Sequence, residues 1–259
     1  MKDALGDRMK GSYESRTKYF LPRRTYTLIR LDGKAFHTFT KDFQRPYDMT
    51  LMAAMDYTTK MLCENVQGCK LGYVQSDEIS LLLTDFDKIT TSAYFDNNIQ
   101  KIASVTASMA SAYFNQFMRD NNITNKLAFF DSRVFSIADP IEVENYFIWR
   151  QADAVRNSIS MTAQSLYSHK ELNGKSTSDM QDMCMEKGVN WNDQPTGFKR
   201  GRMCVKEEYE LEVKEGSKMS GLTLTRNRWV VDGAIWITKD RENFSQLVPR
   251  MKQEVEYGI

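Results

Sequence analysis

The stretch from Lys70 to Leu83 most constrains the fold, because it has the pattern of a buried β-hairpin with two acidic residues at its tip. Its apolar residues lead into and out of the polar run Gln-Ser-Asp-Glu, which predicts strands at Cys69–Gln75 and Glu78–Thr84 joined by a tight turn. Two carboxylates held beside a core need a compensating charge, and a divalent cation is the usual one. The turn acids Asp77 and Glu78 are therefore candidate functional residues.

The elements expected on either side of this hairpin indicate the fold class. A β-rich run from Thr25 to Asp32 predicts a strand that ends in an acid. Helical spacing from Tyr47 to Glu64 predicts a helix with Asp48 as its N-cap. An amphipathic helix is expected between Asp96 and Met118, and Leu127 to Ile137 predicts a further strand. The resulting βαββαβ order is that of a ferredoxin-like or polymerase-palm core, so we expect an α+β fold.

The expected topology brings Asp32 close to Asp77. Because the first connection is long and helical, the first two strands should be parallel, with a right-handed crossover. The third strand then returns between them, which places the end of the first strand beside the hairpin turn. Two carboxylates so placed can hold two Mg²⁺ ions ~3.5–4 Å apart, as in phosphoryl or nucleotidyl transfer. Each acid alone is more simply an ordinary turn residue, and only their convergence favours metal-dependent nucleotide chemistry.

Composition limits the class of protein. The 259 residues are 41% apolar and 12% aromatic, which suits one large domain or two small ones with a well-buried core. A net charge of +1 means that a polyanion must be met by a local cluster of basic residues. The four cysteines form no CxxC pair, which favours reduced thiols over a zinc site. No signal-peptide pattern or run of ~18 apolar residues is present, so we expect a cytoplasmic protein without membrane contact.

The second half of the chain is expected to extend this core. We divide the chain into a palm-like catalytic core at residues 1–140 and a helical and β extension at residues 141–259, packed together as one compact unit. The stretch from Glu142 to Tyr167 is helical in length and carries Arg150 and Arg156 near aromatic residues. That mixture suits phosphate contacts and base stacking, and it also suits an ordinary half-buried helix.

Three shorter predictions cover the rest of the extension. Residues 197–202 form a basic loop, and Met203 to Val213 is strand-like. A final hairpin is expected to turn at Asp232 and Gly233.

Five segments in the same order along the chain resemble the histidine-tRNA guanylyltransferase family and its relatives, the 3′-5′ RNA polymerases. These segments are Arg30–Phe39, Phe43–Pro46, Tyr73–Glu78, Phe130–Arg133 and Trp149–Asp153. The resemblance runs from about Tyr26 to Lys206. It implies a polymerase-like palm, a homotetramer, and addition of nucleotides to the 5′ end of tRNA with ATP and GTP as nucleoside triphosphate substrates.

The resemblance also implies roles for individual residues. Asp32 and Asp77 correspond to ligands of two Mg²⁺ ions, Gly33 to a backbone carbonyl ligand, and Glu78 to a catalytic residue that orients the metal shell. The segment that wraps the triphosphate corresponds to Lys34, Ala35, Phe36, His37 and Ser76, with Arg45 where the family usually has a lysine. Lys101, Arg133 and Arg150 resemble family positions that contact the triphosphate or the tRNA end. Further candidates for contact with RNA, taken from the extension itself, are Arg156, Asn157, Lys199 and Arg200. The implied chemistry activates a 5′-monophosphate with a nucleoside triphosphate, and the 3′-hydroxyl of the incoming nucleotide then attacks.

One departure from the family pattern bears on substrate choice. Val155–Ser158 stands where eukaryotic members carry His-Ile-Asn-Asn, so the chain resembles the bacterial, archaeal or phage-type relatives that repair 5′-truncated tRNA on a template. Strict histidine-tRNA guanylylation stays an alternative, as does a palm-type nucleotide cyclase, which needs no RNA-binding extension. A non-catalytic RNA-binding module would instead expose stacking aromatics and would not need paired carboxylates.

Overall fold

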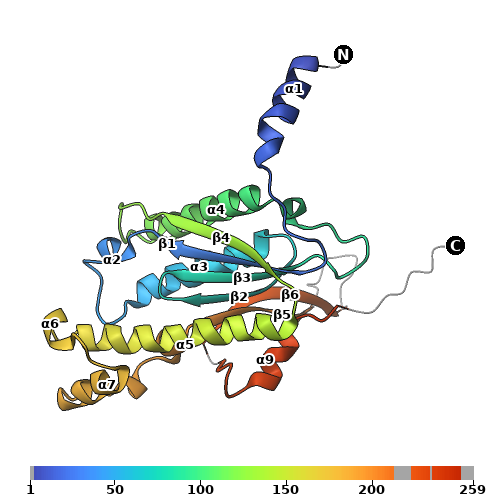
Figure 1. Ribbon diagram of the computed structural model, residues 1–259. Coiled ribbons are helices and arrows are strands. Elements are labelled where there is room, and N and C mark those ends of the chain that lie inside the picture. The colour runs from blue at the N-terminus through green and yellow to red at the C-terminus, as the bar shows by residue number, and fades with distance from the viewer. Residues whose placement is uncertain (1–2, 213–222, 234, 252–259) are drawn as a thin grey trace.

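The computed structural model describes residues 3–212, 223–233 and 235–251. Six strands form one sheet in the order β4-β1-β3-β2-β5-β6, and each neighbouring pair is antiparallel. The strands are β1 Tyr26–Gly33, β2 Cys69–Gln75, β3 Glu78–Thr84, β4 Phe130–Ile137, β5 Arg202–Glu212 and β6 Thr223–Asp232. Helices cover both faces of this sheet (Figure 1).

The predicted βαββαβ core is confirmed. Helix α3 (Met49–Asn65) connects β1 to β2, and α4 (Ile99–Asp120) connects β3 to β4. The side chain of Asp48 accepts hydrogen bonds from two backbone amides in the first turn of α3, so its predicted role as N-cap is also confirmed. Strand β3 lies between β1 and β2, as the crossover argument requires.

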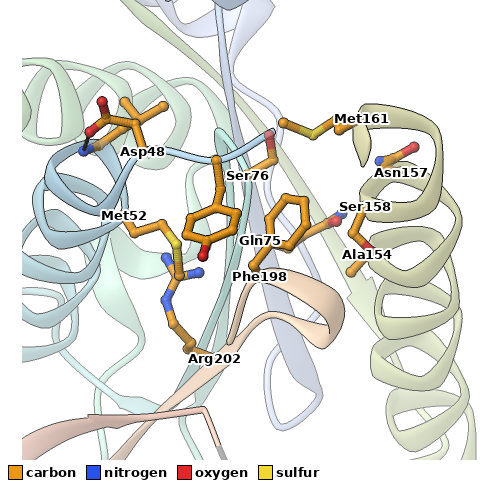
Figure 2. A pocket seen from close by; sticks show the side chains of 12 residues that line it. Asp48, Met52, Gln75, Ser76, Ala154, Asn157, Ser158, Met161, Phe198 and Arg202 are labelled. Carbon is orange, nitrogen blue, oxygen red and sulfur yellow. Dashed lines mark hydrogen bonds between the residues drawn. The ribbon is translucent and has the colours of Figure 1, made fainter. Parts of the chain in front are cut away.

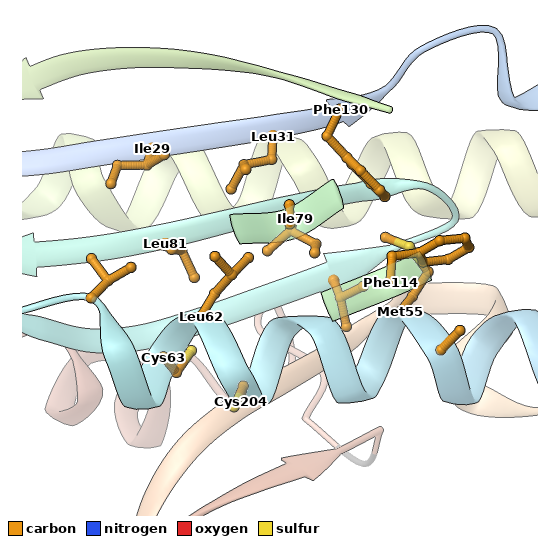
Figure 3. Packing of buried hydrophobic residues seen from close by; sticks show 14 of the residues in the cluster. Ile29, Leu31, Met55, Leu62, Cys63, Ile79, Leu81, Phe114, Phe130 and Cys204 are labelled. Atoms are coloured by element: carbon orange, nitrogen blue, oxygen red, sulfur yellow. The ribbon is translucent and has the colours of Figure 1, made fainter. Parts of the chain in front are cut away.

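The sheet separates two apolar clusters because its side chains alternate in direction along each strand. Ile29 and Leu31 of β1 pack toward α3 and α4, where they meet Leu62 and Phe114 (Figure 3). Leu28 faces the opposite side, toward α5 (Pro140–Gln164) and α9 (Arg241–Leu247). Both faces of the central strands are therefore buried, which explains their nearly continuous apolar sequence.

The remaining helices are short. They are α1 Ala4–Ser12, η1 Glu14–Thr17, α2 Phe36–Phe39, η2 Tyr94–Asn97, α6 His169–Leu172, α7 Thr177–Glu186, η3 Trp191–Asp193 and α8 Thr196–Arg200. Helix α1 has no buried residue and extends away from the sheet (Figure 1). No helix in the described part of the chain is both long and apolar enough to cross a bilayer.

Two predictions for the second half of the chain are wrong. Strand β6 ends at Asp232 and pairs with β5, so the local Asp-Gly signal marks the end of a strand and not a hairpin. Residues 197–200 of the expected basic loop belong to helix α8, and Arg202 begins β5. The first turn of α8 forms because the carbonyl of Pro195 accepts hydrogen bonds from the amides of Phe198 and Lys199. Val213, the expected end of β5, lies outside the described residues.

The boundary proposed between residues 140 and 141 stays a prediction. The structure shows that β5, from the second half, pairs with β2 of the core and so continues the same sheet.

Candidate functional site

The end of β1 and the hairpin turn meet at one edge of the sheet. In the pairing of β1 with β3, Asp32 lies opposite Glu78. The amide of Gly33 donates to the carbonyl of Asp77 at an N–O distance of 3.1 Å. Ser76 and Asp77 form the loop between β2 and β3, and Ser76 adopts a left-handed φ of 47°. The convergence expected from topology is therefore confirmed, although the roles of these residues stay predictions.

The carboxyl group of Asp77 is mostly buried and lacks a neutralising neighbour. Burial raises its pKa to about 6, and the nearby charge of Asp32 adds to the increase. Among the described residues, no lysine or arginine forms an ion pair with Asp77, and none is among the main causes of this pKa shift. Asp32 has a weak partner, because the exposed side chain of Arg133 places Nη2 3.8 Å from its Oδ2. This edge of the sheet therefore carries negative charge that the chain leaves largely uncompensated.

Such a pair of acids fits a Mg²⁺ site of the kind completed by substrate. Mg²⁺ is usually held by one or two carboxylates together with water and substrate phosphates. Across residues 3–212, 223–233 and 235–251, no group of three or more His, Cys, Asp or Glu side chains is placed to hold a metal ion. Asp32 and Asp77 could supply two carboxylates to such a site. The charge of Asp77, which no cation of the described chain neutralises, is the observation that fits a bound Mg²⁺.

Glu78 has very different surroundings, although it follows Asp77 directly. Two nitrogens of the Arg150 guanidinium, on α5, donate to its carboxylate: Nε to Oε1 at 2.7 Å and Nη2 to Oε2 at 2.8 Å. Arg30 of β1 adds an ion pair at 2.9 Å. Arg150 Nη2 also contacts Asp153 at 2.6 Å, and the arginine is 2% exposed. Arg150 thus links α5 to the hairpin through this ion pair. Little of its side chain remains exposed for contact with a triphosphate or RNA.

A cavity of about 490 Å³ opens beside Asp77. Most residues predicted to hold Mg²⁺ or the triphosphate line it: Gly33, Ala35, Phe36, His37, Arg45, Ser76 and Asp77. Lys34 and Asp32 are not among its lining residues. The volume lies within the range of about 300–1,000 Å³ that is common for small-molecule sites.

The loop that forms one wall of this cavity is fixed at both ends. At its start, a Cβ on Gly33 would lie 2.2 Å from the ring of Phe36, so glycine is required for Phe36 to pack into the core. At its end, Asp48 accepts from the amide of Gln44 at 3.1 Å while it caps α3. Positions Ala35 to Arg45 are thus held between β1 and α3.

Sequence reasoning missed several residues that line the cavity. The missed residues are Thr40, Phe43, Gln44, Pro46, Tyr47, Asp48, Leu51, Met161 and Gln164. Asp48 and its neighbours could have been inferred, because the cap directly follows the Arg45–Pro46 segment. Met161 and Gln164 come from the end of α5, and nothing in their local sequence indicates that this helix passes the hairpin turn.

Two predicted contact residues, Arg133 and Lys101, lie on opposite faces of the sheet, because Ser132 faces α4 and the next residue along β4 faces away from it. Arg133 of β4 approaches Asp32, as described above. Lys101 lies in the first turn of α4 and is exposed. Farther along α4, Thr106 contacts Ser132 at 2.9 Å and the hydroxyl of Ser111 accepts from the amide of Phe130, so the helix approaches the Asp32 end only toward its C-terminus. Lys101 is consequently remote from the two acids within one chain.

The remaining predicted contacts are on α5 and α8. Arg156 is exposed and pairs with Asp153 at 2.9 Å, and Asn157 is exposed near the hairpin. Lys199 is 7% exposed, and its ammonium donates to the carbonyl of Asn192. The guanidinium of Arg200 lies 3.8 Å from the ring centroid of Trp236. Burial lowers the pKa of Lys199, so α8 presents much less basic surface than the predicted loop.

Comparisons with known proteins point to one family. The family model described as tRNAHis guanylyltransferase matches residues 6–138. A bacterial tRNA(His) guanylyltransferase-like protein, solved in complex with ATP, is 47% identical with a TM-score of 0.84 and covers 95% of this chain and 99% of its own. The same type of protein in complex with GTP is 45% identical, with a TM-score of 0.80 and the same coverage. A tRNA(His) guanylyltransferase from Kluyveromyces lactis is 30% identical over 200 residues, or 69% of this chain and 81% of that protein.

Proposed function

Because the chain belongs to the tRNAHis guanylyltransferase family and is a nucleotidyltransferase, we propose that it adds nucleotides in the 3′-5′ direction to the 5′ end of truncated tRNA. The observation that carries this proposal is the meeting of Asp32 and Asp77 beside a cavity that seven of the residues predicted to hold Mg²⁺ or the triphosphate line. A nucleotide cyclase is not favoured, because the family and its relatives are described by their tRNA chemistry.

The residues of the site have separable roles in this proposal. Asp32 and Asp77, with the carbonyl of Gly33, hold Mg²⁺, which supplies Lewis-acid stabilisation of charge on the phosphates. The exposed guanidinium of Arg45 at the cavity binds the triphosphate of ATP or GTP, for which its planar fork is suited. Glu78 and Arg150 keep the turn in place and do not contact substrate.

The choice of nucleotide is proposed to come from the RNA template. Val155 has neither a donor nor an acceptor, so it cannot supply the polar contact that a histidine at this position could make. Watson–Crick pairing with the opposing 3′ strand of the acceptor stem provides selection instead. A mispaired nucleotide would hold its 3′-hydroxyl away from in-line geometry, and small misplacements of this kind are costly to rate.

The test uses 5′-monophosphorylated, truncated tRNAs with Mg²⁺, ATP and labelled nucleotides. The opposing template base is changed in turn to each of the four. We expect growth at the 5′ end by whichever nucleotide the template specifies, on several tRNAs. Addition of guanosine alone, only to histidine tRNA and whatever the template, would show a strict guanylyltransferase, and no 5′ growth at all would reject the reaction.

We further propose that the enzyme works as a cytoplasmic homotetramer. Helix α1 supports contact between copies, since Leu5 and Met9 are 60% and 48% exposed on a helix with no buried residue of its own. Light scattering measures the mass of the assembly formed by the wild-type chain and by the Leu5→Lys and Met9→Lys variants. A monomer in the wild type would contradict it.

A further inference from the structure

A second cavity adjoins the first on the α5 side of the hairpin tip. It is smaller, about 50 Å³, and residues of α3, β2, α5 and α8 surround it (Figure 2). The residues that line both cavities are Tyr47, Asp48, Leu51, Ser76 and Met161. A ligand in the larger cavity therefore lies next to the mouth of the smaller one.

Two buried polar atoms at this second cavity have no hydrogen-bond partner. Gln75 is 3% exposed, and its Oε1 is buried and unpaired. Arg202 is 6% exposed, and its Nη2 is likewise buried and unpaired. Buried polar groups are nearly always hydrogen-bonded, so two such atoms on residues that line one small cavity indicate a missing partner.

The chain has already neutralised the charge of Arg202. Its Nε donates to Asp56, and its Nη1 donates to the carbonyl of Gly197 at 3.2 Å. The unpaired Nη2 therefore offers a hydrogen bond from a compensated group, which suits a neutral acceptor better than a second anion.

The walls of the cavity are aromatic and flexible. Tyr47 and Phe198 lie with their ring centroids 4.9 Å apart. Met52 reaches the cavity from α3, and Met161 reaches it from α5 (Figure 2). The present volume is close to that of one or two water molecules, at about 30 Å³ each. Unbranched methionine side chains can turn aside to admit a larger flat group.

We propose that this cavity binds a nucleobase. A base has flat faces that pack on aromatic and thioether walls, and its edge carries a donor next to an acceptor. Gln75 Oε1 accepts from the N–H or amino group, and Arg202 Nη2 donates to the ring nitrogen or carbonyl oxygen. The inference rests on the proposed function for the source of the base, which is either a free nucleoside triphosphate or the 5′-terminal nucleotide of the RNA.

Two variants and one matched control test the inference. Gln75→Met keeps the length of the side chain and removes the acceptor, and Ala154→Met fills the cavity from α5. Thr84→Val is the control, because Thr84 is 3% exposed with an unpaired Oγ1 at the far end of the same hairpin. Denaturation midpoints of all three proteins show whether each is folded.

Binding is measured by calorimetry with probes that differ only in the base. The free-nucleotide arm compares ATP and GTP with inorganic triphosphate. The RNA arm compares 5′-monophosphorylated truncated tRNA with the same RNA carrying an abasic 5′-terminal nucleotide. We expect both variants to bind the base-bearing probe of one arm about tenfold more weakly, with the probe lacking a base and the Thr84→Val protein unchanged.

The arm that responds identifies the source of the base, and either response supports the inference. Unchanged affinity of Gln75→Met and Ala154→Met for every base-bearing probe would show that the cavity holds only solvent, and would overturn it. If the wild type fails to extend tRNA but the variants bind ATP more weakly than it does, the cavity still binds a base. Only the proposed reaction is then rejected.

Discussion

Two neighbouring acids at the hairpin tip, Glu78 and Asp77, differ in whether the chain supplies a cationic partner. On the α5 side, Glu78 is buried with both carboxylate oxygens bound by Arg150 and with Arg30 beside it. On the cavity side, Asp77 has no described cation beside it, and its pKa rises to about 6. One acid therefore stabilises the packing of a helix, and the other remains available for a ligand.

This difference in pairing indicates different roles for Glu78 and Asp77. A buried charge that is fully paired inside the chain cannot also recruit an external cation without breaking that pair. A buried charge left unpaired costs stability in the free protein, and this cost is typical of a binding or catalytic group. Proximity to Asp32 alone would not distinguish Asp77 from Glu78, whereas their hydrogen-bond partners do.

The largest expected effect is on catalysis. Asp32→Ala or Asp77→Ala should abolish nucleotide addition, because each removes a carboxylate on which the proposed Mg²⁺ site depends. The variants should remain folded, since neither acid has a close ion pair to lose. Nucleotide addition to truncated tRNA checks the loss of activity, and circular dichroism checks that the variants are folded. Near wild-type addition by either variant in Mg²⁺ rejects the metal assignment.

Removal of Arg150 should instead reduce stability. Arg150→Met leaves Glu78 buried with Arg30 alone, and breaking a buried pair on one side typically costs about 3–5 kcal/mol. Urea denaturation measures the loss. The matched control is Arg156→Met, six residues farther along α5 and exposed, which should change the free energy of unfolding by less than about 1 kcal/mol. Equal effects of the two changes would contradict the structural role given to Glu78.

Asp77→Asn should stabilise the metal-free protein at high pH. Because the pKa of Asp77 rises from 3.8 in the unfolded chain to about 6 in the fold, the folded state retains a proton across that window that the unfolded state loses. Stability of the wild type therefore falls as pH rises from about 4 to 6, and the cost persists above 6. The variant should be more stable by about 3 kcal/mol at pH 8 and similar at pH 4. Denaturation in EDTA at both pH values checks this, and a destabilised variant at pH 8 would disprove it.

The smallest effect is expected at the exposed arginine of the cavity. Arg45→Lys places the family's usual residue at this position and should change the KM for ATP by only a few fold, whereas Arg45→Ala should raise it about tenfold. Neither change should move the denaturation midpoint, in contrast to Arg150→Met. A large loss of stability in Arg45→Ala would show that the two arginines are not as different as their burial indicates.

Much of the core could be predicted because local patterns and topology agreed. The apolar residues on both sides of Gln75–Glu78 predicted the two strands of the hairpin, and a long helical crossover was enough to bring Asp32 to the turn. Partners distant in sequence could not be predicted. Nothing near Arg150 indicates that it binds Glu78, and the basic run at Lys199 and Arg200 gave no sign that aromatic rings would cover it. Charge alone suggested RNA contacts at residues whose packing leaves them little exposed basic surface, and those contacts stay predictions.

Binding of Mn²⁺ tests the central claim that the unpaired acids form the cation site. Mn²⁺ takes the same oxygen ligands as Mg²⁺ and can be followed by electron paramagnetic resonance. With ATP present, the wild type and Thr84→Val should bind Mn²⁺ equally, and Asp77→Asn should bind it at least tenfold more weakly. Equal Mn²⁺ affinity in the wild type and Asp77→Asn would contradict the account.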